Sequence, residues 1–228
     1  MNPSEISRAL AIHYSETFKR YGANSLGVDW GPNADDHRLR LDQMLHVMRN
    51  GRPGSETPSL LDVGCGFGSL IDRANELQIP LAYTGIDICK PMVEFARNRH
   101  PQSAWIADDF LNLEMPKQFD YVICNCILTQ KLEATIREMD DFLKMLVRRM
   151  FDLCKIGCAF NTMTSHVNFT SPNLYYRSPS ELLAWCMSEI SSRVVIDSAY
   201  PLFEFTVYLY REDANGLKYG AHRKVSEK

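Results

Sequence analysis

The chain has 228 residues, of which 45% are hydrophobic and 23% charged, and its formal net charge is −3. This composition is typical of a globular protein with a sizeable core, and it excludes wholesale disorder. No apolar run approaches the roughly 20 residues that a membrane-spanning helix needs. Because the chain has no excess of positive charge, we expect neither nucleic acid nor a membrane surface as its partner.

The first 55 residues are predicted to form two helices. Asn2, Pro3 and Glu5 are typical of a helix start, with a capping residue, a proline in the first turn and a carboxylate for a capping box. The apolar face of this helix recurs about once per turn, at Ile6, Leu10, Tyr14, Phe18 and Tyr21. The second helix is predicted to start near Asn33 and to end before Gly51.

From residue 56 onward, short apolar runs alternate with helical periods. The predicted strands span 60–63, 83–86, 104–107, 121–125, 158–163, 194–197 and 205–210. Crossovers of helix length between strands indicate a parallel sheet that is covered on both faces. Residues 198–204 are too short for such a crossover, so the last strand should be antiparallel. We therefore expect an α/β core over 56–212, preceded by a helical lid over 1–55 and followed by a tail over 213–228.

The cysteine pattern indicates reduced thiols. The chain has seven cysteines, an odd number, and most lie in apolar runs such as YVICNCIL. A secreted disulfide scaffold normally has an even number in a shorter chain, and the first 20 residues lack the apolar core of a signal peptide. No set of cysteine and histidine residues has the spacing of a zinc site. We expect a cytoplasmic protein with buried thiols and no bound metal.

The most informative motif is LLDVGCGFGSL, in which a predicted strand runs into three alternating glycines that open a helix. Gly64, Gly66 and Gly68 allow the backbone to turn sharply and let a ligand approach without a Cβ in the way. The helix that follows offers unpaired N–H groups to a negative or polar ligand. Ser69 departs from the G-x-G-x-x-G fingerprint of dinucleotide-binding proteins, which argues against a dinucleotide as the ligand.

Two carboxylates help to identify the ligand. Asp62 comes just before the first glycine, where it would repel a pyrophosphate and attract an α-ammonium group. Asp87 ends the second predicted strand, where a carboxylate can accept hydrogen bonds from both hydroxyls of a ribose. A ribose joined to a cationic amino acid, with no phosphate, describes S-adenosylmethionine better than it describes NAD.

At this point the sequence resembles the class I S-adenosylmethionine-dependent methyltransferases. The segments that carry the resemblance are LLDVGCGFG, YTGIDIC, IADDF and FDYVICNCIL, and the order of elements matches from about residue 59 to 212. The resemblance implies a Rossmann-like, doubly wound sheet of seven strands, mostly parallel, with an antiparallel last strand. It also implies an enzyme whose cofactor is S-adenosyl-L-methionine.

The resemblance assigns roles to individual residues. The three glycines would line the methionine part of the cofactor, and Asp87 would hold the ribose. Ile88 would pack on the adenine, and Asp108 would accept from the adenine amino group, with the backbone of Asp109 or Phe110 nearby. The Asn125 carbonyl would hold the ammonium. The Asp108-Asp109 pair also suits a turn or a helix cap. Arg40 would pair with the cofactor carboxylate, although Arg38 and Arg40 equally suit a solvated helix face.

The acceptor is less well specified by the sequence. His166 and Tyr14 are candidates for a catalytic group. The candidates for the wall of an acceptor pocket, which core packing would explain equally well, are Trp30, Tyr175, Tyr176 and Phe205. The chain lacks the [DN]-P-P-[YFW] motif of amino-group DNA methyltransferases and the Pro-Cys nucleophile of cytosine C5 enzymes. We expect methyl transfer to an O or N atom of a small molecule in specialised metabolism, because the GVDWG and LYY segments are similar to those of small bacterial methyltransferases with such roles.

Three alternatives stay open. A transfer RNA or protein methyltransferase would have the same core, and a non-catalytic subunit would bind the cofactor without turnover. An NAD-linked oxidoreductase is the most distant of the three. The sequence specifies neither the oligomeric state nor the acceptor.

Overall fold

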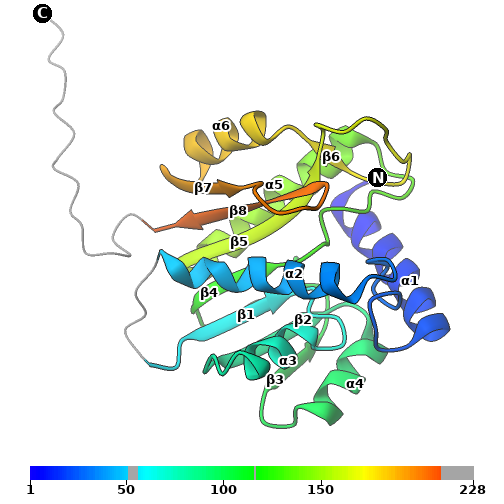
Figure 1. The fold of residues 1–228 in the computed structure, drawn as a ribbon, viewed down its shortest axis with the longest axis vertical. Helices are drawn as coiled ribbons and strands as arrows, with labels where there is room; N and C mark the ends of the chain where they lie inside the picture. Colours follow the sequence, from blue (N-terminus) through cyan, green and yellow to red (C-terminus); the bar gives the residue numbers. More distant parts are fainter. Residues whose placement is uncertain (51–55, 116, 212–228) are drawn as a thin grey trace, which may run out of the picture.

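The computed structural model describes residues 1–50, 56–115 and 117–211 (Figure 1). Its helices are α1 (Pro3–Tyr21), α2 (Ala34–Leu45), η1 (His46–Arg49), α3 (Ser69–Glu76), α4 (Lys90–Arg99), α5 (Ile136–Leu153) and α6 (Pro179–Glu189). Its strands are β1 (Ser59–Val63), β2 (Ala82–Asp87), β3 (Ala104–Ala107), β4 (Phe119–Cys124), β5 (Cys154–Thr164), β6 (Tyr176–Arg177), β7 (Arg193–Asp197) and β8 (Glu204–Tyr210). Strands and helices alternate from β1 to β3, and β4 then follows β3 without a helix between them, in the order predicted.

The strands form one sheet in the order β3-β2-β1-β4-β5-β8-β7, with the short β6 paired to the end of β5. β1 pairs in parallel with both β2 and β4, so the chain order reverses direction at β1. β8 is antiparallel to β5 and to β7, which confirms the predicted antiparallel last strand. The sequence analysis missed β6, because two residues leave no periodicity to detect.

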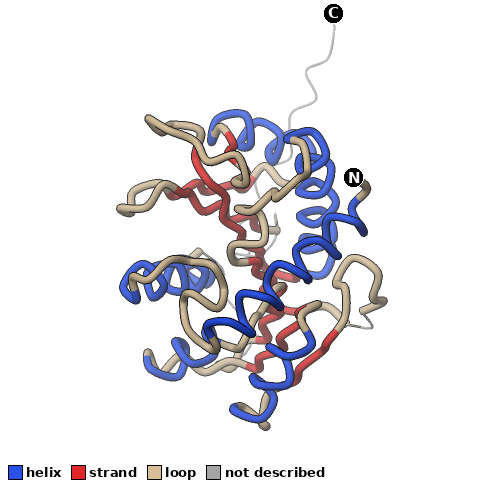
Figure 2. The backbone as a smooth tube through the Cα atoms, turned by 90° about the vertical axis from the view of Figure 1, so that its right-hand side faces the viewer, coloured by secondary structure: helices blue, strands red, loops and turns tan. Residues whose placement is uncertain are grey.

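Helices cover both faces of the sheet, and Figure 2 shows the strands between the two helical layers. On one face α1, α5 and α6 bury their apolar residues in a common cluster with the sheet, and Ile6 and Leu10 contribute to it from α1. On the other face α2, α3 and α4 form the second cluster, to which α2 contributes Leu41 and Met44. The start of α1 therefore belongs to the first cluster and α2 to the second, while the later part of α1 reaches α4.

This separation bears on the predicted lid over residues 1–55. α2 packs beside α3 as an ordinary layer helix, and only α1 and the loop after it lie over the carboxyl ends of the strands. The boundary predicted after residue 55 adjoins residues 51–55, and the predicted tail over 213–228 also falls outside the described residues. Whether α1 opens and closes stays a prediction.

Local signals place the starts of α1 and α2 where the sequence predicts them, after Asn2 and Asn33. Asn2 and Glu5 form a capping box at the start of α1, and Thr135 and Glu138 form another at the start of α5. All seven cysteines are buried and free, which confirms the prediction of buried, reduced thiols. Among the described residues, no helix combines the length and the apolar character that crossing a membrane would require.

Candidate active site

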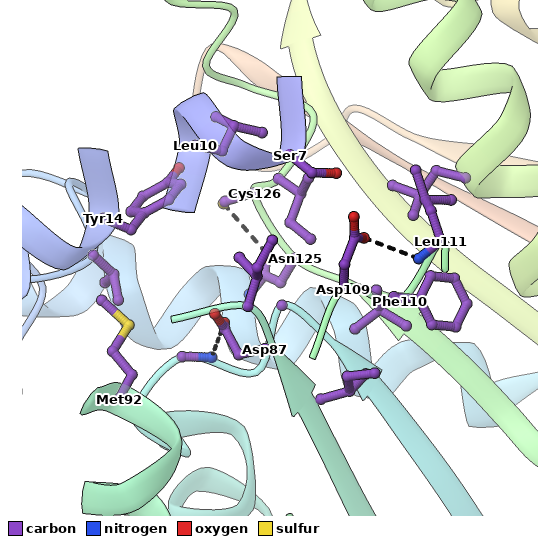
Figure 3. Close-up of a pocket in the computed structure, with 18 of the residues that line it drawn as sticks. Ser7, Leu10, Tyr14, Asp87, Met92, Asp109, Phe110, Leu111, Asn125 and Cys126 are labelled. Atoms are coloured by element: carbon purple, nitrogen blue, oxygen red, sulfur yellow. Dashed lines mark hydrogen bonds between the residues drawn. The ribbon is translucent and has the colours of Figure 1, made fainter. Parts of the chain in front are cut away.

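A cavity lies at the carboxyl ends of β1, β2 and β4, which is where open α/β sheets bind their ligands when the strand order reverses. The segments at the ends of β1, β2, β3 and β4, the helices α1, α4 and α5, and the loop after α1 build its wall. The lining residues are Ser7, Leu10, Tyr14, Val28, Trp30, Val63, Gly64, Gly66, Ile86, Asp87, Ile88, Met92, Asp108, Asp109, Phe110, Leu111, Asn125, Cys126, Ile127, Phe142 and Leu146. α1 crosses over this edge, and Figure 3 shows Ser7, Leu10 and Tyr14 at the cavity.

The glycine turn after β1 forms one wall of the cavity. Gly64, Gly66 and Gly68 have φ values of 75°, 53° and 88°, a region that other residues rarely adopt. A Cβ at Gly64 would lie 2.4 Å from Cδ1 of Ile127, which itself lines the cavity. Gly64 and Gly66 therefore reach the cavity as predicted, whereas Gly68 is the N-cap residue of α3 and does not line it.

Asp87 joins the glycine turn to the end of β2. One carboxylate oxygen accepts from the Gly66 N–H at 2.8 Å, drawn as the dashed line at Asp87 in Figure 3. The other oxygen accepts from the Cys89 N–H at 2.7 Å. Burial raises the pKa of Asp87, and the two backbone hydrogen bonds oppose that rise. Because a carboxylate has about four lone-pair sites, Asp87 keeps acceptor capacity for two further donors in the cavity.

Asp62 occupies a different environment from the one that the sequence analysis expected. It is buried in the middle of β1, where its Oδ2 accepts from the Tyr83 hydroxyl at 2.6 Å. It does not line the cavity, so the structure gives it no contact with a ligand there. Burial raises the pKa of Asp62 to about 7, the Tyr83 hydrogen bond opposes the rise, and the nearby Asp87 adds to it.

The loop after β3 separates the roles of two adjacent carboxylates. Asp109 accepts from the Leu111 N–H at 3.0 Å and from the Asn112 side chain at 2.8 Å, so it fixes the turn. Asp108 is exposed, lines the cavity, and accepts only from the adjacent Asp109 N–H at 2.7 Å among the described residues. Asp109 is therefore the residue of the Asp108-Asp109 pair that fixes the turn, as the sequence allowed for the pair. Ile88 and Phe110 line the same side of the cavity.

Asn125, directly after β4, presents an unsatisfied donor. The residue is 6% exposed, its Oδ1 accepts a weak bond from the Cys126 thiol at 3.4 Å, and its Nδ2 has no hydrogen-bond partner within the described part of the chain. A buried amide without a partner is costly, so such a group at a cavity wall suits a ligand that supplies the acceptor. Figure 3 shows Asn125 between Asp87 and Cys126.

The two candidate catalytic residues lie in different places. Tyr14 lines the cavity, and its hydroxyl has no hydrogen-bond partner within residues 1–50, 56–115 and 117–211. Burial above all, with charge repulsion from groups that include Asp29 and Asp87, raises the pKa of Tyr14, so the hydroxyl stays protonated and can donate. His166 is exposed on the loop after β5 and is absent from the cavity wall. The structure thus brings only Tyr14 to the site.

Arg40 also lies away from the cavity wall. Its guanidinium donates to Glu204, at 2.8 Å from Nε and 2.6 Å from Nη2, instead of facing the cavity. The predicted pairing of Arg40 with a ligand carboxylate has no counterpart in this arrangement. Its side chain is 13% exposed, so Arg40 does not belong to a solvated face either.

The sequence analysis missed several residues of the wall. Ser7 and Leu10 come from α1, and Phe142 and Leu146 come from α5. Ser7 lies about one turn before Leu10 and two turns before Tyr14, so helical spacing from Tyr14 would have found it. No local signal marks Phe142 or Leu146, because their periodicity is that of any buried helix face.

Comparisons with known proteins agree with this geometry. Residues 60–145 match the family model of the methyltransferase domain. The chain is 28% identical over 151 residues to a protein of Mycobacterium tuberculosis named as a methyltransferase, a match that covers 65% of this chain and 90% of that protein. It is also 28% identical over 124 residues to the dTDP-4-amino-2,3,4,6-tetradeoxy-D-glucose N,N-dimethyltransferase of Saccharopolyspora spinosa, covering 54% of this chain and 43% of that enzyme.

The fold has a counterpart among solved structures. The magnesium protoporphyrin IX methyltransferase of Synechocystis, solved with bound S-adenosylmethionine, has a TM-score of 0.61 and 16% identity. That likeness covers 89% of this chain and 97% of the other. The family match and the named relatives support a class I S-adenosylmethionine-dependent methyltransferase, and the shared fold agrees with that assignment. The protein is therefore an enzyme of the methyltransferase type, as the glycine turn and Asp87 predict.

Proposed function

We propose that the protein transfers a methyl group from S-adenosylmethionine to an oxygen or nitrogen atom of a small molecule in specialised metabolism. The observation that carries the proposal is the cavity itself. It combines a free acceptor capacity on Asp87 with an unsatisfied donor on Asn125, and the chain's own α1 covers it. The cavity therefore suits a ligand that has both donor and acceptor groups.

The residues present fit the cofactor. Gly64 and Gly66 leave room for close approach of its methionine part, and Asp87 can accept from both ribose hydroxyls. The Asn125 carbonyl would accept from the ammonium group, and its orphaned Nδ2 would donate to a carboxylate or acceptor oxygen. Ile88, Asp108 and Phe110 lie together on one side of the cavity, where an adenine ring would meet an apolar surface and a carboxylate.

When bound, the cofactor supplies a sulfonium methyl group with a good leaving group, so the protein has mainly to align the reactants and exclude water. Leu10 of α1 and Phe142 and Leu146 of α5 give the cavity an apolar wall that would exclude water. Tyr14 would donate a hydrogen bond to the acceptor and orient it, since its raised pKa makes it a poor base.

Two observations support a small acceptor. A helix of the same chain lies over the cavity, which favours a ligand that enters the cavity over a polymer that lies across it. The net charge of −3 gives no general attraction for nucleic acid. One relative is named for an amino-sugar nucleotide, which supports amines as the first acceptors to test.

Calorimetric titration with S-adenosylmethionine, S-adenosylhomocysteine and NADH tests the cofactor assignment by measuring binding. In thermal unfolding, a ligand at about 100 times its dissociation constant should stabilise the fold by ~2.7 kcal/mol and raise the melting temperature by roughly 5–10 °C. Binding of NADH alone would overturn the assignment. A metabolite library of amines and alcohols, screened for S-adenosylhomocysteine formation, then tests the acceptor. Turnover with transfer RNA or protein only, or binding without any turnover, would contradict a small acceptor.

A further inference from the structure

A buried ion pair lies outside the cavity wall. The side chains of Arg40 and Glu204 are 13% and 3% exposed, and both Nε and Nη2 of Arg40 donate to the same Glu204 oxygen. Arg40 lies on α2 and Glu204 begins β8, so the pair joins parts of the chain that are distant in sequence. A buried ion pair adds little net stability compared with apolar residues of the same volume, so stability alone explains this one poorly.

The other Glu204 oxygen connects to the cavity through Asn161. It accepts from Asn161 Nδ2 at 2.8 Å, and Asn161 Oδ1 accepts from the Cys126 N–H at 2.7 Å. Cys126 lines the cavity and has a φ of 63°, a left-handed conformation that is unfavourable for a side chain of this kind. The Asn161 bond thus holds a strained turn directly after Asn125, and Glu204 fixes which end of the Asn161 amide faces the Cys126 N–H. Asn161 Nδ2 also donates to the Cys126 sulfur at 3.2 Å.

The Arg40 side of the pair connects to the opposite wall. Arg40 Nη1 donates to the Trp30 carbonyl at 3.4 Å, and the guanidinium lies 5.7 Å from the centre of the Trp30 ring. Trp30 lines the cavity and belongs to the loop that follows α1. A single carboxylate is therefore connected both to the turn after β4 and to the N-terminal wall.

We propose that Glu204 is a positioning residue for methyl transfer, which sets the Asn125–Cys126 turn through Asn161 and the Trp30 wall through Arg40. This inference rests on the proposed cofactor site. Every polar atom of the network has a defined partner, so the network has one low-energy arrangement. Glu204 itself touches neither wall, and it acts only through its two neighbours.

A swap of donor and acceptor tests the proposal. Glu204→Gln places an amide against the Asn161 amide, so two donors meet or Asn161 turns its oxygen away from the Cys126 N–H. We expect S-adenosylhomocysteine to bind about 10-fold more weakly or worse, the size of effect when a hydrogen bond to a charged group is lost. Adding Asn161→Asp restores an acceptor for both neighbours and the original charge. The double variant should bind within about 3-fold of the wild type.

Two further measurements separate positioning from general damage. The ligand 5′-methylthioadenosine lacks the amino-acid part that the turn would hold, so Glu204→Gln should weaken its binding much less than that of S-adenosylhomocysteine. Arg40→Lys keeps the charge opposite Glu204 but loses the Nη1 bond to the Trp30 carbonyl and the guanidinium near the Trp30 ring, and it should also weaken S-adenosylhomocysteine binding. It provides the decisive comparison if Glu204→Gln alone does not fold.

Matched controls are available in exposed ion pairs. Glu189→Gln breaks an exposed pair with Arg148, and Arg38→Lys alters an exposed pair on the same helix as Arg40. Both should leave S-adenosylhomocysteine binding unchanged. If the wild type fails to bind this ligand, the proposed function is wrong. Glu204 has no positioning role if the wild type binds S-adenosylhomocysteine and Arg40→Lys and every folded Glu204 variant bind it with the same affinity. It also has none if the variants bind S-adenosylhomocysteine and 5′-methylthioadenosine more weakly by the same factor.

Discussion

Replacing Asp62 with asparagine should remove a large pH-dependent term from the stability of this protein. Asp62 is 3% exposed, and its pKa in the folded protein is raised to about 7. A carboxyl whose pKa is raised on folding stabilises the fold fully below its unfolded pKa, about 3.9, and this contribution is lost as the pH rises through the folded value. The wild type should therefore lose stability between about pH 4 and pH 7 through this group.

The size of the effect follows from the shift. A rise of about three pKa units corresponds to about 4 kcal/mol, and roughly 2–3 kcal/mol of this falls between pH 5 and pH 8. Asp62→Asn keeps an oxygen that can accept from the Tyr83 hydroxyl and cannot ionise. The stability of the variant relative to the wild type should therefore rise by roughly 2–3 kcal/mol between pH 5 and pH 8.

Urea unfolding of both proteins at half-unit steps from pH 5 to pH 8.5 measures this difference directly. Carboxylates whose environment is the same in both proteins cancel when the two curves are subtracted. Asp152→Asn, which changes an exposed residue at the end of α5, provides the matched control and should give a flat difference. A difference between Asp62→Asn and the wild type that does not vary with pH would refute the reasoning, because the buried carboxyl would then titrate as it does in the unfolded chain.

Three further predictions concern the cavity. Asp87→Ala should weaken S-adenosylhomocysteine binding by at least ~100-fold in calorimetry, since two hydrogen bonds to a charged acceptor are lost; near-normal affinity would exclude a ribose role. Gly64→Ala should also abolish measurable binding, because the φ of 75° is unfavourable and the new methyl would meet Ile127, and adding Ile127→Ala should recover binding only in part. Tyr14→Phe should keep the affinity for S-adenosylhomocysteine within about 3-fold and lower turnover about 10-fold or more, the loss expected for one hydrogen bond to the reacting acceptor. Unchanged turnover with an identified acceptor would show that Tyr14 takes no part in the reaction.

The local sequence determined most helices and strands, and it determined the site residues that directly follow a strand. Each of these residues lies at the end of a predicted strand: the glycine turn, Asp87, Ile88, Asp108 and Asn125. The carboxyl ends of parallel strands meet at one edge, so those residues could be brought together from the sequence alone. The antiparallel β8 was predictable for a similar reason, because the segment before it is too short for any other connection.

Only the tertiary structure decided which way buried polar residues face. Asp62 and Gly64 are two residues apart, yet one pairs with Tyr83 in the interior and the other lines the cavity. Arg40 looked equally suited to the cofactor and to solvent, and its partner is instead Glu204, which is 164 residues away in the chain. The partner of a buried charge depends on which distant segments share its surroundings, and no local periodicity records that information.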